Sequence, residues 1–141
     1  MRVLGLDVGT KTVGVALSDP LGYTAQPVET IRYSVPPEAY RRLFSLIREN
    51  GVDHLLVGYP LNMNGSEGPQ ALKVREFLKG FEKYLAQKEF SISIELRDER
   101  LSTVAAERTL LEADLSRAKR KKVIDKMAAV FILQGYLDSK S

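Results

Sequence analysis

The chain has 141 residues, of which 44% are hydrophobic and 28% charged, and it contains no cysteine and a single histidine, His54. This profile is typical of one soluble globular domain over residues 1–141. It excludes disulfides, thiolate zinc sites, a cysteine nucleophile and a metal cage of several histidines. The formal net charge of +3 is by itself too small to indicate nucleic-acid binding.

The first third of the chain predicts antiparallel strands. Residues 2–8 are rich in Val and Leu, and residues 12–18 alternate Val and Leu with small residues on the other side of a glycine-containing turn. Two such runs predict a β-hairpin. A third strand is expected over residues 28–33.

The middle of the chain predicts helices that alternate with strands. Pro36 and Pro37 suit the first turn of a helix that ends at Gly51. The later elements expected here are a short buried strand over 54–58, a helix over 70–87 and a strand over 91–97. Such crossover connections between strands predict a mixed sheet with helices on both faces.

The last part of the chain predicts two more helices. Ser102 can cap a helix that reaches residue 113. The final helix, over residues 123–137, is apolar nearly all round and is therefore expected to be well buried.

Acidic residues follow or end several of these elements. Asp7 lies near the end of the first strand, Asp98 and Glu99 end the fifth, and Asp125 opens the last helix. Strand alternation groups Glu99 with Glu95 and Arg97, but alternation often fails at a last residue, so either Asp98 or Glu99 can be the inward acid. Each acid alone also has a structural explanation. Asp7 can cap a turn, Asp98 and Glu99 can be an exposed charge cluster at a strand–helix turn, and Asp125 can interact with the helix dipole.

Together, these acids indicate a site made of oxygen ligands. Carboxylates from a first strand, a later strand end and a terminal helix would meet at one sheet edge. Such a site suits one or two Mg²⁺ or Mn²⁺ ions rather than zinc. Two ions of this kind support phosphodiester cleavage without Cys or His.

The positive charge is concentrated in one segment. Residues 115–126 hold six basic residues and one acidic residue, whereas the remaining chain holds 15 basic and 17 acidic residues. We expect this segment to contact phosphate, although most charge runs are merely solvated. Its proposed nucleic-acid-binding residues are Arg117, Lys119, Arg120, Lys121 and Lys122.

Two further places are expected to contact nucleic acid. Lys11 lies at the hairpin tip, four residues after Asp7, and Arg100 follows the fifth strand. The loop between residues 59 and 69 is long and glycine-containing, which predicts a mobile flap that offers Asn62, Asn64 and Ser66 as neutral partners. A plain surface loop and an exposed turn lysine are the alternatives.

Four motifs occur in one order along nearly the whole chain. They are DVGTKTVGVA from Asp7, GYPLNMNGS from Gly58, DERLST from Asp98 and KVIDKMAA from Lys122. This pattern resembles the YqgF/RuvX family, with Tyr59 as a departure where that family commonly has Leu.

The resemblance implies several properties. It implies a ribonuclease H-like fold, with a five-stranded sheet in the order 3-2-1-4-5. It implies that Asp7, Glu99 and Asp125 are catalytic, metal-binding acids, and that the substrate is precursor 16S rRNA, matured at its 5′ end. A Holliday junction resolvase acting on branched DNA, as a dimer rather than a monomer, is the alternative that the same resemblance allows.

Two other interpretations compete with a nuclease. The opening motif also resembles the phosphate loop of sugar kinases and actin-like ATPases, but these need two lobes and the chain supplies one. A non-catalytic RNA-binding module for ribosome assembly would use the same basic segment, yet it would gain little from acids that face phosphates. The early charge at Arg2, the absence of an apolar run near 18 residues and the absence of cysteine predict a cytoplasmic protein without a membrane span.

Overall fold

The computed structural model describes the backbone of residues 1–101 and 117–140, and the side chains of residues 1–100 and 127–140. Its strands form one mixed sheet in the order β3-β2-β1-β4-β5, which confirms the predicted ribonuclease H-like order. The strands are β1 (Val3–Val8), β2 (Thr12–Ser18), β3 (Ala25–Arg32), β4 (His54–Tyr59) and β5 (Ser93–Asp98). The helices are α1 (Pro36–Glu49), α2 (Pro69–Gln87) and α4 (Arg117–Lys140), and a 3₁₀ turn covers Glu99–Leu101.

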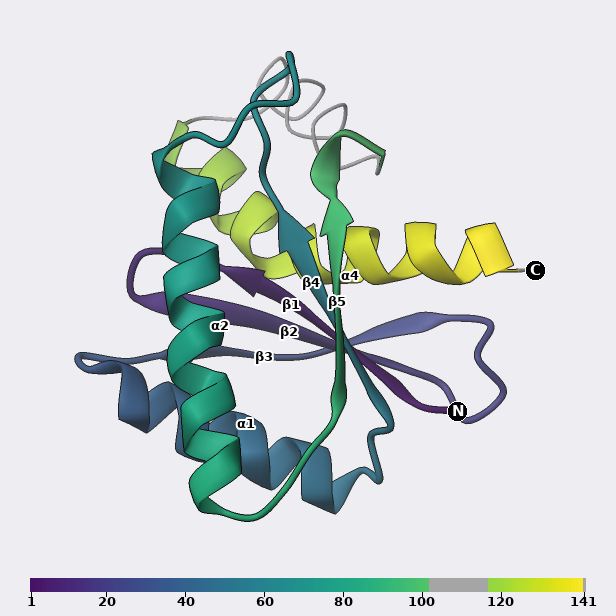
Figure 1. Ribbon diagram of the computed structural model, residues 1–141. Helices are drawn as coiled ribbons and strands as arrows, with labels where there is room; N and C mark the ends of the chain where they lie inside the picture. Colours follow the sequence, from purple (N-terminus) through teal and green to yellow (C-terminus); the bar gives the residue numbers. More distant parts are fainter. Residues whose placement is uncertain (102–116, 141) are drawn as a thin grey trace.

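The helices cover both faces of the sheet (Figure 1). On one face, α1 and α2 bury the side chains of Leu4, Leu6 and Val8 from β1 in the larger hydrophobic core. On the other face, α4 packs against β1, β2 and β3, and the smaller core contains Val3 of β1. Because successive strand residues point to opposite faces, the α4 face also receives Gly5 and Asp7.

The partner strand presents small residues on this same face. β1 and β2 pair antiparallel, with Gly5 opposite Ala16 and Asp7 opposite Gly14. Ala16 belongs to the α4-side core, whereas its neighbours Val15 and Leu17 belong to the other. The Asp7 face of β1 thus coincides with the face of β2 that carries only the small residues Gly14, Ala16 and Ser18.

The absence of a side chain at Gly5 lets α4 lie directly on β1. A Cβ at Gly5 would lie 2.9 Å from the Leu133 Cβ and 3.4 Å from the carbonyl oxygen of Ala129. The buried positions of α4 recur one turn apart, as Ala128, Ile132 and Tyr136 and as Ala129, Leu133 and Leu137. The expectation of a buried last helix is confirmed for this stripe.

The starts of two predicted elements differ from the structure by three residues or more, and one predicted helix cannot be compared with it. β3 begins at Ala25 rather than at residue 28, and α4 begins at Arg117 rather than at residue 123. The basic run is therefore helical and forms the first turns of the last helix instead of preceding it. The helix expected over residues 102–113 lies outside the described residues.

Among the described residues, no helix is both long enough and apolar enough to cross a membrane.

Candidate active site

Asp7 lies at the carboxyl-terminal end of the central strand. Its side chain is half-buried on the α4 face, one residue beyond the Leu6–Val57 pair that joins β1 to β4. The next residue of β4 is Gly58. Asp7 is therefore flanked by glycine on both sides, by Gly14 of β2 and by Gly58 of β4. Neither of these two neighbours has a side chain that would cover the Asp7 carboxylate, which is half-exposed at the carboxyl-terminal end of β1.

Glu99 lies on the same face, two strands away. Its side chain is 9% exposed. A Cβ built at Gly58 would lie 3.0 Å from Glu99 Oε1 and 2.6 Å from the Cδ1 of Ile132 in α4. The Glu99 carboxylate thus extends over the end of β4, between the sheet and α4, and toward the strand that carries Asp7.

Asp98 points away from this place. Its carboxylate pairs with Arg100, at 2.7 Å from Nη2, and also accepts the backbone N–H of Arg100. The hydrogen bond from the Arg100 guanidinium holds the pKa of Asp98 below its ordinary value. Of the two acids between which the sequence left the choice open, Glu99 is the one on the Asp7 face.

Asp125 is part of α4, and its backbone lies one turn before Ala129. The Ala129 carbonyl lies over Gly5. Gln134, further along α4, bonds through its side chain to the backbone of Tyr23 and Ala25 at the start of β3. The helix therefore runs from the carboxyl edge of β1 toward its amino end, so that Asp125 is on the Asp7 side of Ala129. Its side chain is outside the described residues.

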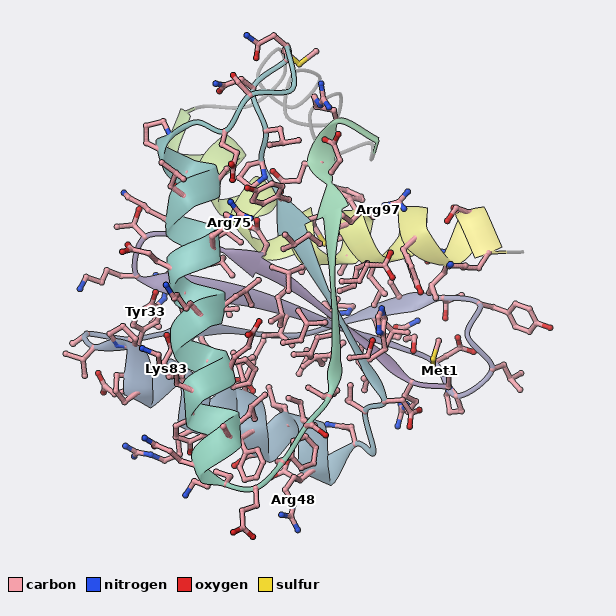
Figure 2. All side chains as sticks on the ribbon, viewed as in Figure 1. Met1, Tyr33, Arg48, Arg75, Lys83 and Arg97 are labelled. Carbon is pink, nitrogen blue, oxygen red and sulfur yellow. The ribbon has the colours of Figure 1, made fainter. Side chains whose placement is uncertain are left out.

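Arg97 is a residue of this edge that the sequence did not single out. It pairs with Gly58 across β5 and β4 and lies on the α4 face, two residues before Glu99 (Figure 2). Its Nε is buried and has no hydrogen-bond partner among the described residues. Alternation placed it with Glu99, but a basic residue in a strand gave no signal that its Nε would be buried.

The loop after β4 is more organised than the expected flap. The Asn62 N–H donates to the carbonyl of Ser66, and the Gly65 N–H donates to that of Asn62. Asn64 Oδ1 accepts from both the backbone and the hydroxyl of Ser66, and Asn62 Nδ2 donates to that hydroxyl. Both side-chain amides expected to face nucleic acid, those of Asn62 and Asn64, therefore form hydrogen bonds within the loop.

Two arginine side chains from outside the loop bind to it, one from the turn after β5 and one from α2. Arg100 Nη1 donates to the Met63 carbonyl at 3.0 Å. Glu67 pairs with Arg75 of α2 at 3.1 Å and accepts a hydrogen bond from the hydroxyl of Tyr59. Arg100 thereby ties the loop to Asp98, which gives it a structural contact besides any contact with nucleic acid.

The remaining predicted basic residues lie at two positions. Lys11 is exposed at the β1–β2 turn, where its Nζ donates to the Ser34 carbonyl at 2.9 Å. The run of Arg117, Lys119, Arg120, Lys121 and Lys122 forms the first turns of α4, and its side chains are outside the described residues.

The donor set at this edge is oxygen-based. Asp7 and Glu99 are carboxylates, and His54 lies at the opposite end of β4, bonded to Ser93 and Glu95. Within the described residues, no group of three or more His, Cys, Asp or Glu side chains is close enough to hold a metal ion. Two described carboxylates on one face fit a hard divalent cation, which needs further oxygen ligands from elsewhere.

Structures with this fold include Holliday junction resolvases. The chain superposes on Thermus thermophilus RuvC in complex with a Holliday junction substrate with a TM-score of 0.62, at 14% identity, covering 99% of this chain and 95% of that one. The yeast mitochondrial Holliday junction resolvase Ydc2 gives a TM-score of 0.52 at 11% identity, with 96% and 78% coverage. These likenesses confirm the fold.

Sequence relatives are much closer. A protein of Geobacillus sp. (strain WCH70), named "Putative pre-16S rRNA nuclease", is 58% identical over 142 residues, covering 99% of each chain. A protein of the same name from Desulforamulus reducens is 57% identical, covering 99% of this chain and 98% of its own. The family model described as "RuvX: Holliday junction resolvase" matches residues 1–139. With this match and these relatives, the chain belongs to the RuvX family of nucleases.

Proposed function

We propose that residues 1–141 form one metal-dependent nuclease domain that acts on precursor 16S rRNA during maturation of its 5′ end, in the cytoplasm. The observation that carries the proposal is the placement of Asp7 and Glu99 on the same, α4-covered face at the carboxyl edge of β1 and β4. The relatives at over 50% identity bear the name of such a nuclease, and this supports the choice of RNA.

Asp7, Glu99 and Asp125 would hold the cation, one or two ions of Mg²⁺ or Mn²⁺. When bound, such a cation supplies charge for the phosphate oxygens and lowers the pKa of a water molecule. The chain itself fixes where this happens. Asp7 is held by the central strand, and Glu99 is held by burial between Gly58 and Ile132. Asp125 would come from α4, one turn from the helix–strand contact at Gly5.

Substrate phosphates would be bound by cations around this edge. Lys11 follows β1 at the hairpin tip, and Arg100 follows β5 beside the loop. The basic residues of α4 lie in its first turns, before the part of the helix that contacts β1. All three groups therefore come from segments next to the Asp7 end of the sheet. Asn62 and Asn64 would donate to the substrate those side-chain N–H groups that do not form hydrogen bonds within the loop. Such contacts should make binding strongly salt-dependent.

A Holliday junction resolvase is the second candidate, and the description of the matching family model favours it. Branched DNA has two strands to cut symmetrically, so this activity needs a dimer, whereas a monomer suffices to cut one RNA strand. The oligomeric state in solution therefore separates the two candidates.

Cleavage assays test the proposal. An RNA with the precursor leader of 16S rRNA and a four-way DNA junction should be incubated with Mg²⁺ and with Mn²⁺. We expect the RNA to be cut, and we expect Asp7→Asn, Glu99→Gln and Asp125→Asn each to lower the rate by at least about a hundredfold. Binding of the RNA should persist in these variants.

Glu82→Gln, an exposed position on α2, is the matched control and should cut like the wild type. Cleavage of the four-way junction without cleavage of the RNA would show that the substrate is branched DNA. RNA binding without cleavage under either metal would favour the non-catalytic module. Normal cleavage by Asp125→Asn would show that Asp125 is not a metal ligand.

A further inference from the structure

A cavity lies on the other face of the sheet, directly behind the Asp7 end of β1. It has a volume of about 230 Å³. Residues 8–10, which follow Asp7 into the β1–β2 turn, form one wall, and the rings of Tyr33, Tyr40 and Phe77 form the floor. The cavity is smaller than the roughly 300–1,000 Å³ typical of sites for drug-sized ligands. It therefore suits one flat ring system.

The walls of this cavity are held in place without a ligand. The Gly9 N–H donates to the Thr12 carbonyl at 2.7 Å, which closes the turn. Lys11 Nζ donates to the Ser34 carbonyl, and the Tyr33 hydroxyl donates to the Thr10 carbonyl at 3.4 Å. Both bonds tie the turn to the segment between β3 and α1. The site is thus preformed, which lowers the cost of binding.

The floor offers an aromatic surface that is not fully used. Tyr40 is buried, its hydroxyl donates to the Phe77 carbonyl at 2.8 Å, and its ring packs on Phe77 at 5.0 Å between centroids. Tyr33 lies 6.0 Å from Phe77 and is only half-buried, at the end of the molecule where the turn lies (Figure 2). Tyr33 is therefore the ring of this set that can still stack with a ligand.

The rim carries charges of both signs. Lys73 and Glu76 of α2 are exposed and line the cavity mouth, beside the exposed Pro36. A cation and a carboxylate at the mouth can meet the carbonyl and amino edges of a heterocycle. An aliphatic ligand would gain nothing from either.

We propose that this cavity binds one unpaired nucleobase of the RNA, close to the nucleotide whose phosphodiester bond is cut. The inference rests on the proposed function for the identity of the strand. Val8, which lines the cavity, directly follows Asp7 in β1 at about 3.4 Å along the strand, and successive strand residues open to opposite faces. An RNA strand that crosses the end of β1 can then place a phosphate near Asp7 while a neighbouring base enters the cavity.

A binding experiment tests this without any need for cleavage. Single-stranded eight-nucleotide RNAs, each with 2-aminopurine at one position, are titrated with the Asp7→Asn protein. Stacking on Tyr33 should quench the fluorescence at one position. Tyr33→Ala should weaken binding of that RNA by about tenfold, the typical cost of losing one base–aromatic stack, whereas Tyr33→Phe should keep most of it.

An abasic residue at the quenched position supplies the second arm. It should weaken binding to the Tyr33 protein by about the same factor and should make the Tyr33→Ala change neutral, because the two partners form one contact. Tyr23→Ala, a 68% exposed tyrosine on the β2–β3 connection, is the matched control and should change nothing. Circular dichroism of each variant shows that it folds.

Equal weakening of the base-containing and abasic RNAs by Tyr33→Ala would overturn the inference, as would the absence of any quenched position. Its failure is distinguishable from failure of the proposed function. If the wild type cuts RNA but shows no base-dependent binding, the nuclease function is supported and the base-binding cavity is wrong. If base-dependent binding is present and no cleavage occurs, the reverse holds.

Discussion

Glu99 is held in place by the absence of a side chain at Gly58. Gly58→Ala would add a methyl group 3.0 Å from Glu99 Oε1 and 2.6 Å from Ile132 Cδ1. Both atoms are the ends of side chains that can move, so the protein should still fold. Displacing the carboxylate by about 1 Å should cost up to roughly a hundredfold in the cleavage rate, measured under single-turnover conditions.

A double variant separates the two contacts at Gly58. Ile132→Val removes the Cδ1 atom, so the pair Gly58→Ala/Ile132→Val should regain stability in thermal unfolding but should not regain cleavage. Full recovery of cleavage in this pair would mean that helix displacement, rather than Glu99, caused the loss.

Arg100 joins the loop after β4 to the end of β5. Arg100→Lys keeps a positive charge but loses the forked interaction with Asp98 and Met63. We expect faster amide hydrogen exchange in the loop, at Asn62, Gly65 and Ser66, with α1 unchanged. Unchanged exchange at those three amides would show that the loop's own bonds suffice.

The sequence revealed part of this site. Alternation along β1 and β2 was enough to place Asp7 above small residues, because a side-chain period of two is strict within a paired strand. It could not choose between Asp98 and Glu99, since a 3₁₀ turn follows and the choice depends on Gly58 and on the pairing of Asp98 with Arg100. The burial of the Arg97 Nε and the cavity at Tyr33 depend on packing between distant segments, which no local pattern reports.

At the scale of elements, the contact of α4 with β1 is a tight one. Gly5→Ala would place a Cβ 2.9 Å from the Leu133 Cβ, which cannot rotate away. The helix must shift, so we expect a loss of about 1–3 kcal/mol in the free energy of unfolding, measured by denaturant titration. Gly58→Ala, which meets only mobile side-chain ends, should lose less. Equal losses in the two variants would contradict this account.

An ion pair joins β3 to α1. Arg42 donates from Nη2 to Glu29 at 2.6 Å and from Nε to both carboxylate oxygens, and this bonding lowers the pKa of Glu29 below its ordinary value of 4.5. The carboxylate therefore stabilises the folded state above about pH 4.5, and this contribution decreases as the pH falls through the lower, folded-state pKa.

Glu29→Gln tests this pH dependence. Both side chains are about a third or more exposed, so the loss at pH 7 should be no more than about 1 kcal/mol. The difference from the wild type should shrink toward zero as the pH falls below about 4.5, measured by urea unfolding from pH 7 into the acid range with Glu82→Gln as the control. A difference that persists at low pH would show that packing, and not charge, is the cause.

Element boundaries show why prediction from sequence patterns was incomplete. β3 extends back through Pro27, which a strand prediction normally excludes. Here β3 is an edge strand, and Pro27 pairs with Ala16 where the register shifts between Val15 and Ala16. α4 begins at Arg117, well before its apolar stripe, because Arg, Lys and Ala favour helix without needing a buried face.

The whole molecule is uneven in charge. Six of its basic residues lie in residues 115–126, and the rest of the chain carries 15 basic against 17 acidic residues. If the basic first turns of α4 bind phosphate, Lys121→Gln/Lys122→Gln should weaken RNA binding. The slope of log affinity against log salt should fall by about one for each lysine–phosphate interaction that the variant removes.

A charge-matched control distinguishes local binding from overall charge. Lys79→Gln/Lys83→Gln removes the same number of charges from two exposed positions of α2. Its salt slope should stay within error of the wild type. If both double variants lower the slope equally, the net charge matters and the position of α4 does not.

The central position of β1 has a consequence for synthesis on the ribosome. The meander β3-β2-β1 forms from residues 3–32, but the other edge of β1 pairs only with β4, at residues 54–59. During translation, β1 is therefore an edge strand with free backbone groups while about 20 further residues emerge. The Asp7 face stays open longer, because α4 is made last. A chain halted before residue 117 would have a sheet without the helix that buries Val3 and covers Gly5, and it would expose that apolar face to aggregation.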